Sequence, residues 1–154
     1  MKQANKPRLF CDVMLGKLAR KLRLLGLDVR YERNLKGMTA YRQAKAEGRL
    51  FLTRQHRFRN MPDVLYVNSD KIAEQLEQMS RVFSLKASEE DAERGILTRC
   101  SVCNESLIKI TREQARPGIP FYIYQIHNNF RRCPKCQRIY WPGSHIQEIL
   151  KKGV

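Results

Sequence analysis

Residues 8–26 of this 154-residue chain read RLFCDVMLGKLARKLRLLG. The run from Arg8 to Val13 is short and apolar and predicts a buried strand that ends near Asp12. Leucine and alanine side chains then recur at helical spacing from Leu15 to Leu25, and Gly26 stops the helix. The segment therefore predicts a strand followed directly by a helix, which is the repeating unit of α/β proteins.

The same alternation continues along the first half of the chain. Further strands are expected at residues 27–31, 49–53 and 64–67, and further helices at 39–47 and from Ser69 or Asp70 to about Phe83. This pattern favours a parallel sheet flanked by helices. We therefore predict an α/β domain over residues 1–83, an acidic linker over 84–98 and a small module over 99–154.

Four of the five cysteines stand in two matched pairs. Cys100 and Cys103 form one C-x2-C knuckle, Cys133 and Cys136 form the other, and 29 residues separate the two. Two such knuckles complete a tetrahedral shell of four thiolates, which is typical of a structural zinc ribbon with no open position for catalysis. A redox thiol pair is the rival interpretation, and the matched spacing favours zinc. The fifth cysteine, Cys11, lies in the first strand and is expected to be a buried thiol.

The charge of the chain is high and uneven. Lys and Arg number 30 against 15 Asp and Glu, which gives a formal net charge of +15. Residues 1–60 carry a net +12, residues 61–98 a net −4 and residues 99–154 a net +7. Two basic blocks around an acidic one indicate a polyanionic partner, most commonly nucleic acid. The alternative is a solvated surface without a ligand.

Composition excludes several classes of protein. A hydrophobic fraction of 42% excludes a disordered basic tail. The sequence shows neither an apolar run of about 20 residues nor a signal peptide, so we expect a cytosolic location without membrane contact. A Walker loop, a G-x-S-x-G motif and a dinucleotide fingerprint are all missing from the sequence, which excludes the enzymes that depend on them.

Polar residues follow each predicted strand. Asp12 follows the first strand, Glu32 to Asn34 the second, Thr53 to His56 the third and Asn68 to Asp70 the fourth. The carboxyl ends of parallel strands share one edge of a sheet, and ligands bind there. We therefore expect these clusters to converge. His56 is a candidate acid or base at this edge, against the alternative of an ordinary solvated histidine.

Several of these segments together resemble a known family. Phe10 to Gly26, Gly48 to Arg54, both cysteine knuckles and Tyr140 to His145 are similar, in order, to the Mut-seven C-terminal RNase domain family. The resemblance covers nearly the whole chain. It implies a PIN-like nuclease fold over residues 1–83, fused to a zinc ribbon. It also implies metal-dependent cleavage of RNA, in which Mg2+ or Mn2+ held by acidic residues activates water.

The acidic set that this resemblance implies is incomplete. Asp12 matches the first metal-binding acid of the family, and Asp70 is a second catalytic candidate that could instead cap a helix. The family motif Thr-Arg-Asp is Thr53-Arg54-Gln55 here, so a neutral amide stands where a carboxylate is expected. Asp12, with Asp70 or Glu32, could still bind one Mg2+ or Mn2+ ion weakly. We therefore expect cleavage to be impaired or lost, while RNA binding survives.

Basic and aromatic side chains are the candidate RNA contacts. Phe121 to Tyr124 alternates as a predicted strand of the ribbon, and its outer face could stack bases. The predicted RNA-binding residues are Lys17, Arg20, Lys21, Arg23, Arg33, Arg54, Arg57, Arg59, Tyr122, Tyr124, Arg131 and Arg132. Structured RNA such as tRNA or ribosomal RNA is the expected partner, and the oligomeric state is left open.

Two other functions remain open from the sequence. The first is an active metal-dependent endoribonuclease that uses Asp12. The second is a protein-interaction or toxin–antitoxin-type module that meets its partner through the acidic linker or the ribbon.

Overall fold

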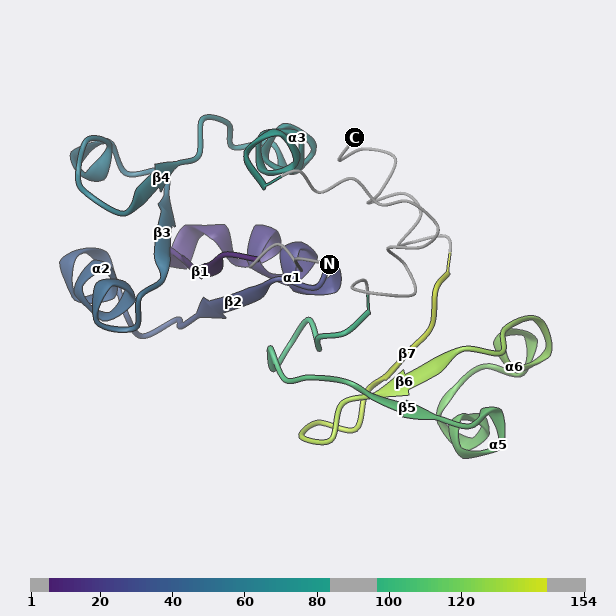
Figure 1. The fold of residues 1–154 in the computed structure, drawn as a ribbon. Helices are drawn as coiled ribbons and strands as arrows, with labels where there is room; N and C mark the ends of the chain where they lie inside the picture. Colours follow the sequence, from purple (N-terminus) through teal and green to yellow (C-terminus); the bar gives the residue numbers. More distant parts are fainter. Residues whose placement is uncertain (1–5, 84–96, 144–154) are drawn as a thin grey trace, which may run out of the picture.

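The computed structural model describes residues 6–83 and 97–143, and its first half alternates strands and helices (Figure 1). The elements are β1 (Arg8–Cys11), the 3-10 turn η1 (Val13–Leu15), α1 (Gly16–Leu24), β2 (Asp28–Tyr31), α2 (Gly37–Ala46), β3 (Leu50–Thr53), the 3-10 turn η2 (His56–Phe58), β4 (Val64–Tyr66) and α3 (Ile72–Phe83). Every strand and helix predicted for this half is present, with ends shifted by a few residues at most. None of the helices in residues 6–83 and 97–143 could span a lipid bilayer.

The four strands of the first half form one parallel sheet in the order β2-β1-β3-β4. β1 lies in the middle, and Leu9 is paired with Val29 of β2 and with Leu50 of β3. Neighbouring strands cover both edges of β1 and helices cover both faces, so Leu9, Phe10 and Cys11 are fully buried. The apolar run near the start of the chain is thus the centre of the sheet, and the predicted α/β fold class is confirmed.

Successive residues of the central strands face opposite layers of the core. Leu9, Cys11 and Leu52 pack with α1 and α3 on one face, whereas Phe10 and Phe51 pack with α2 on the other (Figure 1). This division follows from the two-residue repeat of a strand. Cys11 is the buried thiol that the sequence predicts, and burial raises the pKa of its side chain to about 12.

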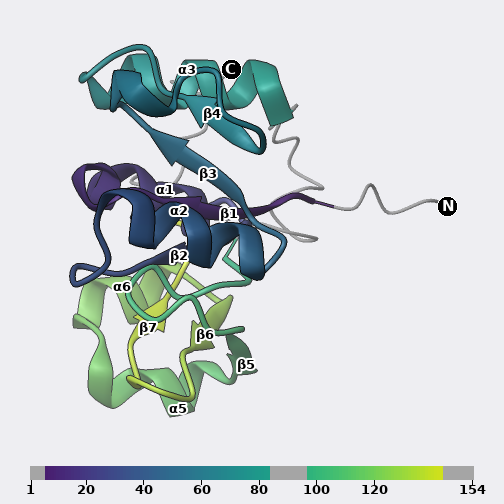
Figure 2. The same ribbon diagram turned by 90° about the vertical axis from the view of Figure 1, so that its left-hand side faces the viewer.

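The order of the strands creates a ligand-binding position at one edge of the sheet. β2 lies on one side of β1, whereas β3 and β4 lie on the other, so the connections diverge at the carboxyl ends of β1 and β3. Open parallel sheets bind ligands at such a point. Asp12 follows β1 and Thr53 ends β3, so both stand at this edge, which is on the left in Figure 2.

The second half contains a three-stranded antiparallel sheet and two short helices. The elements are β5 (Ile108–Ile110), α5 (Arg112–Ala115), the 3-10 turn η3 (Arg116–Gly118), α6 (Phe121–Ile126), β6 (Phe130–Arg132) and β7 (Ile139–Tyr140), with strand order β5-β6-β7. Ile110, Ala115, Ile123 and Phe130 form its buried core, and Trp141 packs against them. Such a small core benefits from a metal that contributes to folding.

The segment from Phe121 to Tyr124 is helical, so its prediction as a strand was wrong. The Tyr124 N–H donates to the Pro120 carbonyl at 3.1 Å, which closes the first turn of α6. Ile123 is the one buried residue of the four, and Phe121 and Tyr122 are 62% and 63% exposed. A strand would have placed Phe121 and Ile123 on the same face. Apart from Ile123, little of this segment is buried, and Pro120, with its fixed φ of −60°, supports the start of a helix.

Arg23 joins the two halves instead of facing solvent. Its Nε donates to the Val29 carbonyl at 2.8 Å, and its Nη1 donates to the carbonyls of Ser101 (2.9 Å) and Val102 (3.2 Å). The residue is 6% exposed, and burial lowers the pKa of its guanidinium. The prediction that Arg23 contacts RNA was therefore wrong, because the second half covers this part of α1.

A second contact covers the free edge of β2. Asn104, in the left-handed region with φ of 62°, accepts the Val29 N–H at its Oδ1 (3.1 Å) and donates its Nδ2 to Asp28 Oδ1 (2.8 Å). Asp28 also accepts from Arg49 at 2.7 Å. Burial alone would raise the pKa of Asp28, but the hydrogen bonds from Arg49 and Asn104 lower it. An uncovered edge strand invites pairing with another chain, and Asn104 blocks it here.

The predicted linker lies largely outside the described residues, as do residues 144–154 of the predicted module. Of residues 84–98, the structure describes Leu97 and Thr98. Leu97 is buried, and its N–H donates to the Leu24 carbonyl at the end of α1 (3.1 Å). The chain is therefore in contact with α1 where it enters the second half.

We predict that Arg23→Met lowers the free energy of unfolding by about 1–3 kcal/mol, since buried carbonyls lose a charged donor while the side-chain volume is nearly kept. The control is Arg20→Met on the exposed side of the same helix, with an expected change within about 0.5 kcal/mol. Urea unfolding of both variants measures the difference. Equal stability of the two would show that the Arg23 contacts contribute nothing.

Candidate functional site

Asp12 stands at the carboxyl end of β1 and is fully buried. Its backbone N–H donates to the Leu52 carbonyl at 2.9 Å, so the register with β3 fixes its position. Its Oδ1 accepts the Val13 N–H at 2.7 Å and caps η1. Its Oδ2 accepts from the Thr53 hydroxyl and from the Gln55 side-chain amide, both at 2.7 Å. Three neutral donors thus hold this carboxylate.

Arg57 sets the orientation of the Gln55 amide. The Arg57 Nε donates to Gln55 Oε1 at 3.2 Å, and a guanidinium offers no acceptor. The amide oxygen therefore faces Arg57, and the amide nitrogen faces Asp12. Arg57 also passes over Gly37, whose φ is 54°, and a Cβ there would lie 2.3 Å from Arg57 Nη2. Glycine at the start of α2 leaves the room that this arrangement needs.

The groups around Asp12 do not fit a site for Mg2+ or Mn2+. These cations bind oxygen ligands, usually one or two carboxylates together with waters, and each carboxylate must offer a free lone pair. Asp12 offers one carboxylate, and the hydroxyl and amide beside it are donors that occupy the lone pairs a cation would use. Over residues 6–83 and 97–143, the four cysteines are the one group of three or more His, Cys, Asp or Glu side chains with ligand atoms close together.

The other two acids considered as metal ligands are exposed. Glu32 pairs with Arg30, with 3.4 Å between the carboxylate oxygen and Nε. Asp70 lies in the turn before α3, where the Ser69 hydroxyl accepts the Lys71 N–H at 3.0 Å. Ser69 therefore supports the turn before α3, the position where the sequence predicts Asp70 as a candidate helix cap.

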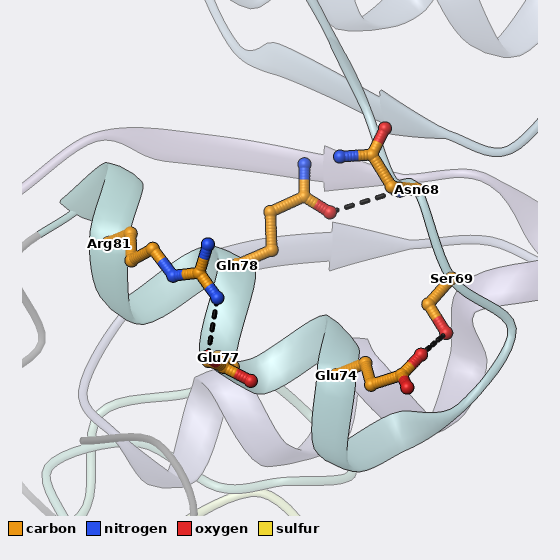
Figure 3. A pocket seen from close by; sticks show the side chains of 6 residues that line it. All are labelled: Asn68, Ser69, Glu74, Glu77, Gln78 and Arg81. Atoms are coloured by element: carbon orange, nitrogen blue, oxygen red, sulfur yellow. Dashed lines mark hydrogen bonds and ion pairs between the residues drawn. The ribbon is translucent and has the colours of Figure 1, made fainter.

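A pocket of about 330 Å3 lies beside this turn (Figure 3). Its lining residues are Asn68, Ser69, Glu74, Glu77, Gln78 and Arg81. Most of their polar groups bond within the pocket: Ser69 donates to Glu74, Arg81 pairs with Glu77, and Gln78 Oε1 accepts the Asn68 N–H. These groups stabilise the β4–α3 connection, and Asp70 is not among the lining residues.

Aromatic rings hold the basic side chains of the loop after β3. The Arg57 guanidinium lies 4.6 Å from the centre of the Phe58 ring, and that of Arg59 lies 5.2 Å from the centre of the Tyr66 ring. His56 is exposed, and its Nε2 lies 3.2 Å from the Tyr66 hydroxyl. The loop therefore presents ordered cations next to the buried Asp12.

The remaining predicted RNA contacts differ in accessibility. Lys17, Arg20, Arg33, Arg57, Arg59 and Tyr122 are exposed, whereas Lys21, Arg54, Tyr124, Arg131 and Arg132 are half-buried. Arg54 donates to the Val67 carbonyl at 3.0 Å, and Arg131 donates to the Leu97 carbonyl at 3.3 Å. The exposed side chains include the cations at the carboxyl edge. Of the half-buried ones, Arg54 and Arg131 use hydrogen-bond donors within the protein.

The four cysteines of the two knuckles are close enough to share one metal ion. Their Sγ atoms all lie within 4.8 Å of one another, and those of Cys100 and Cys136 are 3.6 Å apart. A tetrahedral zinc site with Zn–S bonds of about 2.3 Å has sulfur atoms about 3.8 Å apart. Backbone N–H groups of Cys103 and Cys136 point to the sulfurs of Cys100 (3.4 Å) and Cys133 (3.5 Å). The cluster could therefore hold a metal ion such as zinc, with four protein ligands.

The thiols of this cluster affect one another's ionisation. Burial alone would raise the pKa of Cys100, but hydrogen bonds from the Tyr140 hydroxyl and from backbone N–H groups lower it to about 7. Burial and the neighbouring thiols raise the pKa of Cys103 to about 12 and raise that of Cys133 as well. A bound divalent cation removes this conflict, because it stabilises all four thiolates.

The second half also holds an aromatic and basic cluster that the strand prediction concealed. The centre of the Tyr124 ring lies 4.1 Å from the Arg112 guanidinium and 5.3 Å from that of Arg116. Phe121 stacks on Tyr124 with centres 6.2 Å apart. The available signal was the i, i+3 spacing of Phe121 and Tyr124 after Pro120, which suits one helix face.

One of three comparisons with known proteins finds a match. No curated protein matches it, and no solved structure matches it. The model of the family described as Mut7-C RNAse domain matches residues 7–152, which is nearly the whole chain. The chain belongs to the Mut7-C RNAse domain family, and this membership suggests a ribonuclease-like or RNA-related function.

Proposed function

We propose that this chain binds RNA and that its ability to cleave RNA is impaired or lost. The observation that carries the proposal is the buried Asp12 carboxylate, which accepts hydrogen bonds from Thr53 and Gln55 in place of a cation. The resemblance puts a metal-binding acid at position 12 and a second acid at position 55. In this chain, that pair is a carboxylate and an amide joined by a 2.7 Å hydrogen bond.

The hydrogen bonds of Asp12 and Gln55 also oppose a weak metal site at Asp12. A cation that bound Asp12 would have to displace donors from a fully buried carboxylate. Rotation of the Gln55 amide would present its oxygen to the cation, but would also break its hydrogen bond with Arg57 and turn an NH2 group toward a guanidinium. Arg57 itself adds a positive charge near the site. These costs support loss of the metal-dependent step.

The exposed cations support RNA as the partner. Arg33, Arg57 and Arg59 follow β2 and β3 at the carboxyl edge, and Lys17 and Arg20 lie in α1, which begins at the same edge. Binding of phosphates by such residues releases counterions and contributes most of the affinity at low salt. We propose structured RNA, such as tRNA or ribosomal RNA, as the target class.

We further propose that the metal of the four cysteines is zinc and that its role is structural. Four protein ligands leave no open position for a reacting water. Reduced thiols of this kind persist in the cytosol, which is the location we propose.

We expect purified, zinc-loaded chain to show no change of melting temperature with Mn2+. The variant Gln55→Asp should place two carboxylates together, lose stability without metal, and recover by about 1–3 kcal/mol in millimolar Mn2+. Gln55→Asn is the matched control, because it has the same size as Asp without the charge. Thermal unfolding with and without Mn2+ measures all three.

Two results would contradict the proposal of a lost metal site. One is stabilisation of the parent chain by Mn2+ that disappears in Asp12→Asn. The other is Mn2+-dependent cleavage of RNA by the parent chain that disappears in the same variant, which would establish an active endoribonuclease. Copurification of a protein partner without RNA would favour an interaction module instead.

The double variant Arg33→Gln/Arg59→Gln should bind tRNA about tenfold more weakly than the parent at about 0.1 M salt, with a salt slope smaller by about 1.5, because two phosphate contacts are lost. The matched control removes equal charge from exposed residues near the opposite edge, Lys6→Gln/Lys45→Gln. Fluorescence anisotropy over a salt series measures both. An equal loss in both pairs would mean that total charge matters and the carboxyl edge does not.

Metal analysis should find one zinc ion per chain, and Cys133→Ser should lose it. Chelation should also lower the melting temperature of the whole chain, because Arg23 of α1 is bonded to the first knuckle at Ser101 and Val102. Cys11→Ala is the control and should retain one zinc ion. A full complement of zinc in Cys133→Ser would refute the four-cysteine site.

A further inference from the structure

Helices α5 and α6, with the turn η3 between them, carry a face that the fold does not need for its core. We define the α5–α6 face as Arg112, Arg116, Phe121 and Tyr124, together with Tyr122, which lies about 100° around the helix from Phe121. Phe121 and Tyr122 are 62% and 63% exposed. An exposed aromatic ring forgoes a large burial energy, so two of them on one short helix indicate a surface that binds something.

The cations of this face are held by an aromatic ring. The guanidiniums of Arg112 and Arg116 lie 4.1 Å and 5.3 Å from the centre of the Tyr124 ring, and Arg112 Nε also donates to the Tyr124 carbonyl at 2.8 Å. Phe121 stacks against Tyr124 with an interplanar angle of 25°. The face therefore presents Phe121, which is stacked on one side and 62% exposed, close to two positioned positive charges, with Tyr122 next to it in the helix.

We propose that the α5–α6 face binds unpaired bases of an RNA strand by stacking them on Phe121 and Tyr122, while Arg112 and Arg116 hold the adjacent phosphates. The inference rests on the proposed function and specifies a second contact for the same RNA. Exposed aromatic rings beside guanidiniums are the arrangement by which proteins bind single strands without base-specific hydrogen bonds.

Charge complementarity selects RNA over an apolar protein partner. Residues 97–143 hold eight Lys and Arg against two Asp and Glu, so the surroundings of the face favour a polyanion. α6 also lies on the same side of the molecule as the carboxyl ends of the parallel strands, at the left of Figure 2.

The test uses the full zinc-loaded chain and two probes, a single adenylate strand of about twelve nucleotides and a blunt RNA duplex of about the same length. The variant Phe121→Leu/Tyr122→Leu keeps apolar side chains at both positions but removes the rings. It should bind the single strand about 10- to 100-fold more weakly, with an unchanged salt slope and unchanged affinity for the duplex.

The matched control is Ile126→Ala, which removes a 68% exposed apolar side chain from the same helix and should leave both affinities unchanged. Circular dichroism and zinc content establish that each variant is folded. A second variant, Arg116→Gln, should lower the salt slope for the single strand by about 0.7.

The outcomes separate this inference from the one it rests on. If the parent chain binds neither probe and no tRNA, both proposals fail. If the parent binds RNA and the leucine variant binds the single strand equally well, the stacking site alone is overturned. An equal loss on duplex and single strand also overturns it, because stacking requires unpaired bases. Weaker binding in Ile126→Ala, with no effect of the leucine variant, would assign the face to apolar docking.

Discussion

The buried carboxylate of Asp12 joins the ends of the two central strands. Its own N–H pairs with β3, one oxygen caps the turn that leads into α1, and the other oxygen accepts from Thr53 and Gln55 at the end of β3. A carboxylate with no exposed surface is tolerated in a protein when donors satisfy its oxygens. The position of α1, the start of the loop after β3 and the orientation of Gln55 all depend on this one group.

Under the proposed function, the departure of Gln55 from the motif that the resemblance implies lets Asp12 serve the fold in place of catalysis. Two carboxylates at positions 12 and 55 would repel each other and would need a cation between them. With Gln55 the repulsion is replaced by a hydrogen bond, and the need for the cation disappears. Arg57 then fits beside the amide oxygen, where it would otherwise oppose a metal ion. The exposed cations at this edge of the sheet suit the phosphate binding that we propose.

Features that depend on local sequence patterns were predictable, whereas features that depend on contacts between distant residues were not. Strands such as Leu9 to Cys11 were predictable because burial on both faces makes them continuously apolar. The knuckles were predictable because metal ligation fixes their spacing. The burial of Arg23 was not predictable, because it depends on contacts with residues far away in the sequence. The helical structure of Phe121 to Tyr124 was not predictable either, because the small core buries only Ile123 of this segment. Gln55 was recognised as a missing acid, but the direction of its amide follows from Arg57 and Gly37, which only the three-dimensional arrangement brings together.

The contacts between the halves give the cysteine cluster a role beyond its own ribbon. The carbonyls of Ser101 and Val102 belong to the first knuckle, and Arg23 binds them while it also binds Val29 in the sheet. Asn104, directly after that knuckle, occupies the edge of the same strand. A metal that orders the knuckle therefore also orders the edge of the sheet. Because β2 is the neighbour of β1, and Asp12 directly follows β1, the cysteine cluster and the carboxyl edge share one continuous framework. The exposed cations of the two halves are thereby held in a defined relation.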